Sequence, residues 1–284
     1  MSSMSPVGVR VAPGRRLRID SRRHWFPDLR ALFRSGHLVV LLGRRDITVR
    51  YRQTVLGTVW IFTGPLVSAG LFTFVFGQVA KLPSGGVPYF AFSYAGLLGW
   101  TLFSNALSSA SNSVNSNGAL ISKIYFPRLV LPLASMASTL INTAISFGIM
   151  LIVLVAYGIG FSTHMLLLPV WLLLAMVLAI GMGLVFTAPA VRYRDVNYVT
   201  SVFTSLLLYL SPVAYSTSAV PADLRRFYLL NPLTTIVEGC RWSLLGEADL
   251  SPWAIVYTVA LAVGALIIGA LVFTRLESGF ADVI

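Results

Sequence analysis

Charged side chains are scarce in this sequence, and so are the residues that build disulfides and metal sites. Only 11% of the 284 residues are charged, whereas soluble domains carry about 25%. Cys240 is the single cysteine, which excludes an internal disulfide and a cysteine-ligated metal cluster. The three histidines, His24, His37 and His164, are scattered along the chain. With 56% hydrophobic residues and a mean hydropathy of +0.80, the composition predicts a polytopic membrane protein.

Catalytic and energy-converting motifs are missing as well. The ten acidic residues form no Asp-x-x-Asp pair, no Ser–His–Asp arrangement can be assembled, and neither lysine follows a glycine as in a phosphate-binding loop. Ion-coupled transporters usually need an ionisable group inside the membrane, and the spans expected below contain none. We therefore expect no enzyme activity, cofactor or metal in this chain. If the chain moves a substrate uphill, the energy must come from another protein.

The long runs without charge define the expected spans. A charge at mid-bilayer costs about 3 kcal/mol, so uncharged runs mark the segments that can cross. One run, 129–191, is too long for a single helix and is divided by Tyr157-Gly158-Ile159-Gly160. We expect an all-α fold with six transmembrane helices, at about 58–80, 89–112, 129–157, 165–190, 196–216 and 251–274.

Two regions precede the expected transmembrane domain, which covers 58–276, and a cytoplasmic tail, 277–284, follows it. Residues 1–26 hold six arginines among proline, glycine and serine, and we expect them to be a disordered cytoplasmic leader. In region 27–57, one helix face carries Leu29, Leu32, Phe33, Gly36 and Val40. This pattern predicts an amphipathic helix in the headgroup plane that leads into the first span.

The segment between the fifth and sixth spans has a different character. Its apolar run 227–237 is too short to cross, and charged residues that include Arg225, Glu238 and Arg241 bracket it. Asn231 followed by Pro232 is a favourable N-cap and N1 pair, and Gly246 is a suitable helix stop. We expect two short re-entrant helices within 222–245. An ordinary extramembrane loop is the alternative, but the leucines of this segment need apolar cover.

The basic residues set the orientation. Of the 21 Lys and Arg residues, 17 lie on the side of the N-terminus and 4 on the opposite side. The positive-inside rule therefore places both termini in the cytoplasm. The formal charge of +11 is mainly topological and secondarily attracts anionic lipid, so no nucleic acid partner is expected.

The loop between the second and third spans is the most distinctive feature on the cytoplasmic side. It combines apolar, aromatic and basic residues before a proline, which suits a short docking helix for a soluble partner. The alternative is an interfacial turn with its aromatic rings at headgroup level. The candidate docking residues are Asn117, Leu120, Ser122, Lys123, Ile124, Tyr125, Phe126, Pro127 and Arg128.

Polar and aromatic residues inside the spans allow two interpretations each. The hydroxyl rows of the third span, such as Ser138, Asn142 and Ser146, suit close helix packing or a polar pathway wall. Prolines in spans one and five, Pro65 and Pro212, are expected to kink them. Aromatic residues suit a membrane-interface belt or stacking on sugar rings. The candidate channel-lining residues are Trp60, Phe72, Phe76, Tyr198, Phe203, Tyr209, Pro212 and Tyr215.

Several motifs, in this order, resemble the membrane subunits of ABC-2-type polysaccharide exporters, the O-antigen, teichoic-acid and galactan permeases. Residues 45–57 read RDITVRYRQTVLG and lead to Trp60 and Pro65, and residues 124–128 read IYFPR. Residues 192–195 read RYRD, 210–213 read LSPV, and 231–234 read NPLT before LLG at 244–246. The resemblance covers about residues 28 to 276.

The resemblance implies a homodimer of six-span subunits in the bacterial inner membrane, paired with two copies of a separate ABC ATPase that binds ATP and magnesium. It further implies a gate helix at 28–45, a coupling helix at 117–128, external re-entrant helices at 222–245, and a channel lined by spans one and five. The cargo would be a polyprenyl-pyrophosphate-linked polysaccharide. Arginine binds phosphate bidentately and stays charged. The candidate headgroup-attracting residues are Arg44, Arg45, Arg50, Arg52, Arg192 and Arg194.

Other roles remain open at this point. Topological anchoring is the alternative role for these arginines. An ABC-2 exporter of drugs or small lipids would share the architecture. A non-transporting scaffold for glycan synthesis would use the cytoplasmic loop to bind an enzyme.

Overall fold

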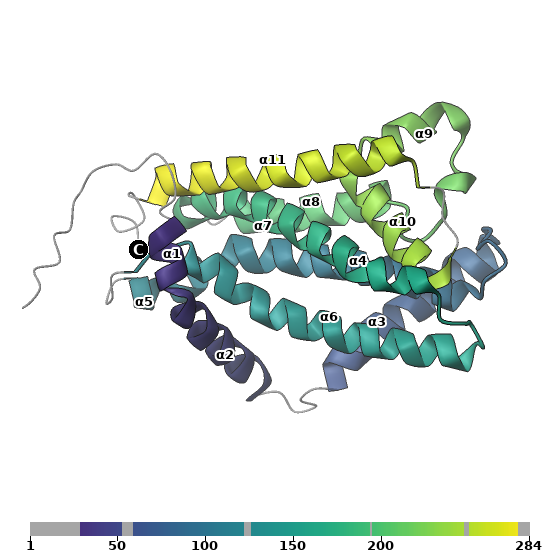
Figure 1. Ribbon diagram of the computed structural model, residues 1–284, viewed down its shortest axis with the longest axis horizontal. Helices are drawn as coiled ribbons and strands as arrows, with labels where there is room; N and C mark the ends of the chain where they lie inside the picture. The colour runs from purple at the N-terminus through teal and green to yellow at the C-terminus, as the bar shows by residue number, and fades with distance from the viewer. Residues whose placement is uncertain (1–28, 53–58, 122–125, 194, 247–249, 278–284) are drawn as a thin grey trace, which may run out of the picture.

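The computed structural model describes residues 29–52, 59–121, 126–193, 195–246 and 250–277, and within these ranges every regular element is a helix (Figure 1). The all-α prediction is confirmed there. The predicted leader 1–26, Ser122 to Tyr125 of the predicted docking loop, Arg194, and the tail from residue 278 onward lie outside the described residues.

Within these described ranges, four helices are long and apolar enough to cross a membrane. The first, Phe62–Val79, combines α3 (Val59–Phe72), which contains Pro65, with the π-helical turn η1 (Thr73–Val79). The second is α6 (Val130–Ala156). The third, Thr163–Arg192, joins the 3₁₀ helix η3 (Thr163–Leu167) to α7 (Leu168–Arg192), and the fourth is α11 (Pro252–Leu276). These bounds lie within a few residues of the predicted ones.

Helix α4 (Tyr89–Asn112) has the bounds predicted for the second span and lies at the centre of the molecule. It packs against α6, α7 and α10 (Pro232–Leu245), and nearly all its residues from Ala91 to Leu107 are buried. Helix α7, which contacts α4, also packs against α11 with direct backbone contact. A Cβ atom on Gly269 would lie 2.1 Å from the carbonyl oxygen of Gly181, so this contact requires glycine.

The fifth predicted span, 196–216, is wrong at its C-terminal end. Helix α8 (Asp195–Leu210) stops at Leu210, and residues 211–216 form a buried or half-buried segment that we call the α8 turn. A residue before proline avoids the helical conformation, so Ser211 and Pro212 end the helix. The prediction that Pro212 kinks a continuing span is therefore also wrong.

The predicted single amphipathic helix at the N-terminal side is two helices, α1 (Leu29–Arg34) and α2 (Gly36–Arg52), separated at Ser35. Helix α2 packs against α6 through Leu42 and Gly43, where a Cβ on Gly43 would lie 2.8 Å from Cβ of Ala137. Phe33 and Val40, from the predicted apolar stripe, are instead 83% and 56% exposed. Leu32 of the same stripe is packed against the core, so only part of the stripe faces the rest of the chain.

The short helices lie at the two ends of the molecule. Figure 1 shows α1, α5 (Gly118–Ile121) and the C-terminal end of α11 together at one end. At the other end lies α9 (Ala222–Leu229), beyond the 3₁₀ helix η4 (Thr217–Ala219) and before α10. Two short helices therefore occupy 222–245 as predicted, with Asn231 as N-cap of α10 and Gly246 ending it at φ +79°.

Candidate functional site

The segment between α4 and α6, residues 113–129, is bonded to three distant elements, and we call it the inner loop. It begins with the 3₁₀ helix η2 (Asn115–Asn117). The amide of the buried Asn117 donates to the carbonyl of Ser113 at 2.8 Å, and its side-chain oxygen accepts a hydrogen bond from Arg45 on α2. Arg45 also pairs with Asp46 at 2.8 Å. One guanidinium therefore joins α2 to the start of the inner loop.

Two further contacts fix the inner loop to α7 and α11. The side-chain amide of Asn115 donates to the carbonyl of Ala190, near the end of α7, at 3.0 Å. Arg128 donates to the backbone carbonyl of Glu277, directly after α11. Burial raises the pKa of the Glu277 carboxyl, and the positive charge of Arg128 opposes that shift. The inner loop is thus hydrogen-bonded to α2, to α7 and to the residue after α11.

The ring of Phe126 is not available for the docking role predicted for it. Phe126 is only 8% exposed and belongs to the chain's own hydrophobic core. A buried ring has no free surface to insert into a groove of another protein, so the prediction of Phe126 as an anchor is corrected. Leu120 and Pro127 are half-buried, and the predicted second anchor, Tyr125, lies outside the described residues.

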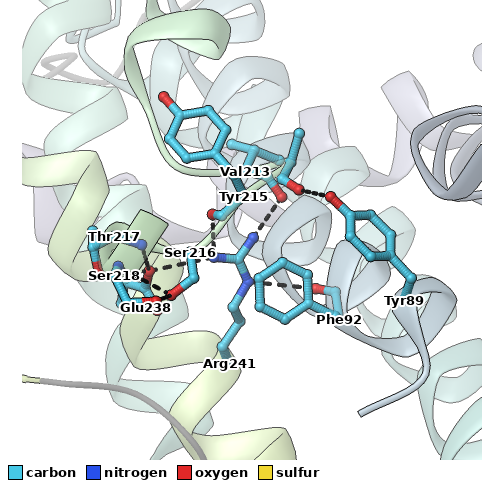
Figure 2. Close-up of polar contacts among 10 residues, drawn as sticks. Tyr89, Phe92, Val213, Tyr215, Ser216, Thr217, Ser218, Glu238 and Arg241 are labelled. Carbon is cyan, nitrogen blue, oxygen red and sulfur yellow. Dashed lines mark hydrogen bonds and ion pairs between the residues drawn. The ribbon is translucent and has the colours of Figure 1, made fainter. Parts of the chain in front are cut away.

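A second polar centre lies at the opposite end of the molecule and is fully enclosed. Figure 2 shows Arg241 of α10 pointing to the α8 turn. Its side chain is 0% exposed. The guanidinium donates to the carbonyls of Val213 at 2.5 Å and Tyr215 at 3.0 Å, and more weakly to that of Phe92 at 3.4 Å. Its central carbon lies 3.9 Å from the ring centroid of Phe92, a cation–π contact.

Glu238 balances this buried charge. Its Oε1 lies 3.4 Å from the guanidinium of Arg241, one helical turn along α10, and only 4% of the residue is exposed. The same oxygen accepts hydrogen bonds from the backbone N–H and the hydroxyl of Thr217, both at 3.1 Å. Tyr89 of α4 donates to the carbonyl of Ala214. Three consecutive carbonyls of the α8 turn, those of Val213, Ala214 and Tyr215, thus receive side-chain donors from α4 and α10.

Residues 37–245, well over half of the chain, match a family model described as "ABC-2 type transporter". The chain belongs to this family. The relatives of this ABC-2 family member include the "O-antigen export system permease protein RfbA" of Myxococcus xanthus, 28% identical over 213 residues, 74% of this chain and 81% of that protein. A Klebsiella pneumoniae protein of the same name is 24% identical over 250 residues, 87% of this chain and 95% of the relative. The "Polysialic acid transport protein KpsM" of Escherichia coli is 24% identical over 242 residues, which are 84% of this chain and 94% of that protein.

The predicted headgroup-attracting arginines of this ABC-2 family member differ in their surroundings. Arg44 is exposed, and Arg192 is exposed with its guanidinium carbon 5.7 Å from the ring centroid of Tyr193. Arg45 is committed to Asp46 and Asn117. Arg50 and Arg52 lie in the last turns of α2, and their side chains, like all of Arg194, are outside what the structure describes.

The predicted channel-lining residues also separate into groups. Tyr198 and Tyr209 on α8 are 74% and 72% exposed. Phe72 and Phe76 pack edge to face with centroids 5.5 Å apart, and Phe203 contacts Phe186 at 5.7 Å. Tyr215 is half-buried and donates to the carbonyl of Tyr209 at 3.1 Å. Pro212 is buried, so its prediction as a lining residue is corrected, and the side chain of Trp60 is not described.

The buried pair of Arg241 and Glu238 is the feature that the sequence interpretation missed. Both residues were assigned to the outer helices as charges that bracket an apolar run, although α10 buries them against the α8 turn. A signal was present in their spacing. Opposite charges three positions apart within the otherwise uncharged segment 232–245 indicate a pair on one helix face.

Proposed function

We propose that this ABC-2 family member is the transmembrane subunit of an ATP-driven exporter of lipid-linked polysaccharide. The observation that carries the proposal is the family match over residues 37–245, together with relatives whose names specify O-antigen export and polysialic acid transport. In this proposal the substrate is a polysaccharide on a polyprenyl pyrophosphate, moved outward across the bacterial inner membrane. ATP and magnesium are bound by a separate ABC ATPase.

The proposed topology has both termini in the cytoplasm and six spans. The first span is α3 together with η1, and the others are α4, α6, α7, α8 and α11. The end of the molecule that holds α1, α5 and the C-terminal end of α11 is then cytoplasmic (Figure 1). The excess of basic residues on that side supports this orientation. Helices α9 and α10 form the outer, re-entrant pair, and α1 with α2 form the gate region.

The proposed assembly is a homodimer with two copies of the ATPase. Support comes from α3 and α8, whose described side chains are hardly buried within one subunit: Ala69 is buried on α3 and Thr200 on α8. The exposed tyrosines of α8, Tyr198 and Tyr209, carry hydroxyl groups that lipid tails do not satisfy. We place these two helices at the contact between subunits, where they border the export path.

The inner loop is the proposed docking segment for the ATPase. Its contacts to α2 through Arg45, to α7 through Asn115 and to α11 through Arg128 provide the mechanical connection. When the ATPase moves the inner loop, α2 moves with it because the guanidinium of Arg45 holds Asn117. The exposed arginines Arg44 and Arg192 are then positioned to attract the pyrophosphate of the substrate.

Reconstitution with the partner ATPase tests the proposal. Vesicles that contain both proteins should lose glycan from the cytoplasmic face only with ATP and an active ATPase. Equal loss with an ATPase that cannot hydrolyse ATP would contradict the function.

The variant Arg45→Ala tests the connection through α2. Loss of a charged hydrogen bond should lower export about fivefold while ATP hydrolysis continues. Arg34→Ala, on the exposed surface of α1, is the matched control and should export at the rate of the unmodified protein. Export by Arg45→Ala at the control rate would exclude this connection.

A further inference from the structure

A polar cavity lies between three of the proposed spans, α3, α4 and α6. Its volume is about 270 Å³, and Gly64 and Pro65 of α3 form part of its wall. Its remaining lining residues carry hydroxyl or carboxamide groups and no formal charge. They are Ser68, Thr101, Asn105, Asn142, Thr143 and Ser146.

These polar residues lie near the middle of their helices. Thr101 and Asn105 are central in α4 (Tyr89–Asn112), and Asn142 to Ser146 are central in α6 (Val130–Ala156). Ser68 lies near the middle of the segment that α3 and η1 form together, Val59 to Val79. The cavity is therefore at the depth of the lipid tails, where polar groups without partners are expensive.

Packing between these helices uses up only part of the hydrogen-bonding capacity of the cavity. Thr101 and Thr143 donate to carbonyls of their own helices, Leu97 at 2.7 Å and Thr139 at 2.9 Å, so their oxygen lone pairs stay available. Asn105 is exposed, and within the described part of the chain its carboxamide makes no hydrogen bond. A carboxamide offers two donors and an acceptor, which hydrocarbon cannot satisfy.

We infer that this cavity is a hydrated niche in the wall of the export path that binds the hydroxyl groups of an uncharged sugar residue. The inference rests on the proposed export function. Sugar hydroxyls donate and accept hydrogen bonds, as do the side chains of the niche. The volume is near the lower limit of small-molecule pockets, about 300 Å³, which fits one sugar ring and not a longer segment. The absence of charge among the lining residues favours neutral sugars over acidic ones.

Thiol labelling tests whether the niche contains water. Cys240 is fully buried, and burial raises the pKa of its thiol to about 12, so the unmodified chain serves as the blank. In vesicles, N-ethylmaleimide should label Asn105→Cys about tenfold faster than Leu140→Cys, because thiolate forms in water. Leu140 is the matched control, since it is 48% exposed on α6 close in sequence to Asn142 but does not line the niche. Equal labelling rates would overturn the inference.

Two further outcomes are decisive. If Asn105→Cys forms a disulfide-linked dimer, the second copy of the chain fills the niche, and the inference is wrong. In cells, export of pulse-labelled glycan should fall at least about fivefold for Asn105→Leu and be retained by Asn105→Gln, which keeps the carboxamide. Export of Asn105→Leu at the unmodified rate would also overturn the inference.

The export assay separates this inference from the proposed function. An unmodified chain that exports no glycan with its ATPase overturns the proposed function, and the sugar assignment with it. Export by the unmodified chain together with slow labelling of Asn105→Cys overturns the niche alone.

Discussion

Replacing Arg241 by methionine removes the donors that hold the α8 turn while keeping a similar apolar stem. The carbonyls of Val213 and Tyr215 lose the guanidinium that donates to them, and that of Phe92 loses a weaker donor. The carboxylate of Glu238 stays buried at 4% exposure without its counter-charge. Removing one member of a buried ion pair typically destabilises a protein by about 3–5 kcal/mol.

This loss is large enough to measure in detergent or nanodiscs. For a chain of this size, about 2–4 °C of melting temperature corresponds to 1 kcal/mol, so Arg241→Met should melt about 6–20 °C lower. Size-exclusion chromatography of heated samples gives the melting temperature. The matched control is Arg226→Met, because Arg226 is exposed on α9 and its loss should change stability by less than about 0.5 kcal/mol.

A double variant distinguishes the pair from its individual members. Glu238→Gln retains an acceptor for Thr217 but removes the negative charge. Added to Arg241→Met, it removes the unpaired charge and should restore part of the lost stability, so the two effects should not add. The reasoning is refuted if Arg241→Met melts within 2 °C, about 1 kcal/mol, of Arg226→Met.

Three further substitutions have defined expectations in the same melting assay. Gly269→Val should lower stability by about 2 kcal/mol or more because its Cβ would lie 2.1 Å from the carbonyl oxygen of Gly181, whereas a Cβ on Gly264 meets nothing within 4 Å. Equal melting of Gly269→Val and Gly264→Val would contradict the packing of α7 on α11. Asn231→Ala removes the N-cap of α10, worth about 1 kcal/mol, and Asn231→Asp, which keeps the cap acceptor, should lose less. Phe126→Ala should lower stability by about 3–5 kcal/mol, and unchanged stability with lost export would restore the docking role.

The features predictable from the sequence are those that depend on local signals. The bounds of α4 follow from an uncharged run, and the start and end of α10 follow from Asn231, Pro232 and Gly246. The signals of α10 act within a few residues, through a capping hydrogen bond or a backbone preference. They are visible in one sequence without knowledge of what packs against the helix.

The features that escaped prediction depend on residues far apart in the chain. The α8 turn is stabilised by Arg241, which follows it by more than twenty residues, and by Tyr89, which precedes it by more than a hundred. The guanidinium has room only because position 96 is glycine, where a Cβ would lie 2.7 Å from Nη2 of Arg241. The burial of Phe126 likewise depends on neighbouring helices, so no periodic pattern in the loop predicts that this ring is buried.

The position of the donors along the chain sets an order of assembly during synthesis. When the ribosome has added α8, Tyr89 is already in place for the carbonyl of Ala214, but Val213 and Tyr215 still wait for Arg241. Newly made chains that end before α10 therefore lack the donors to Val213 and Tyr215 that follow the C-terminal end of α8. We expect nascent chains to become resistant to proteolysis at this end of α8 once α10 has emerged, before α11 completes the subunit.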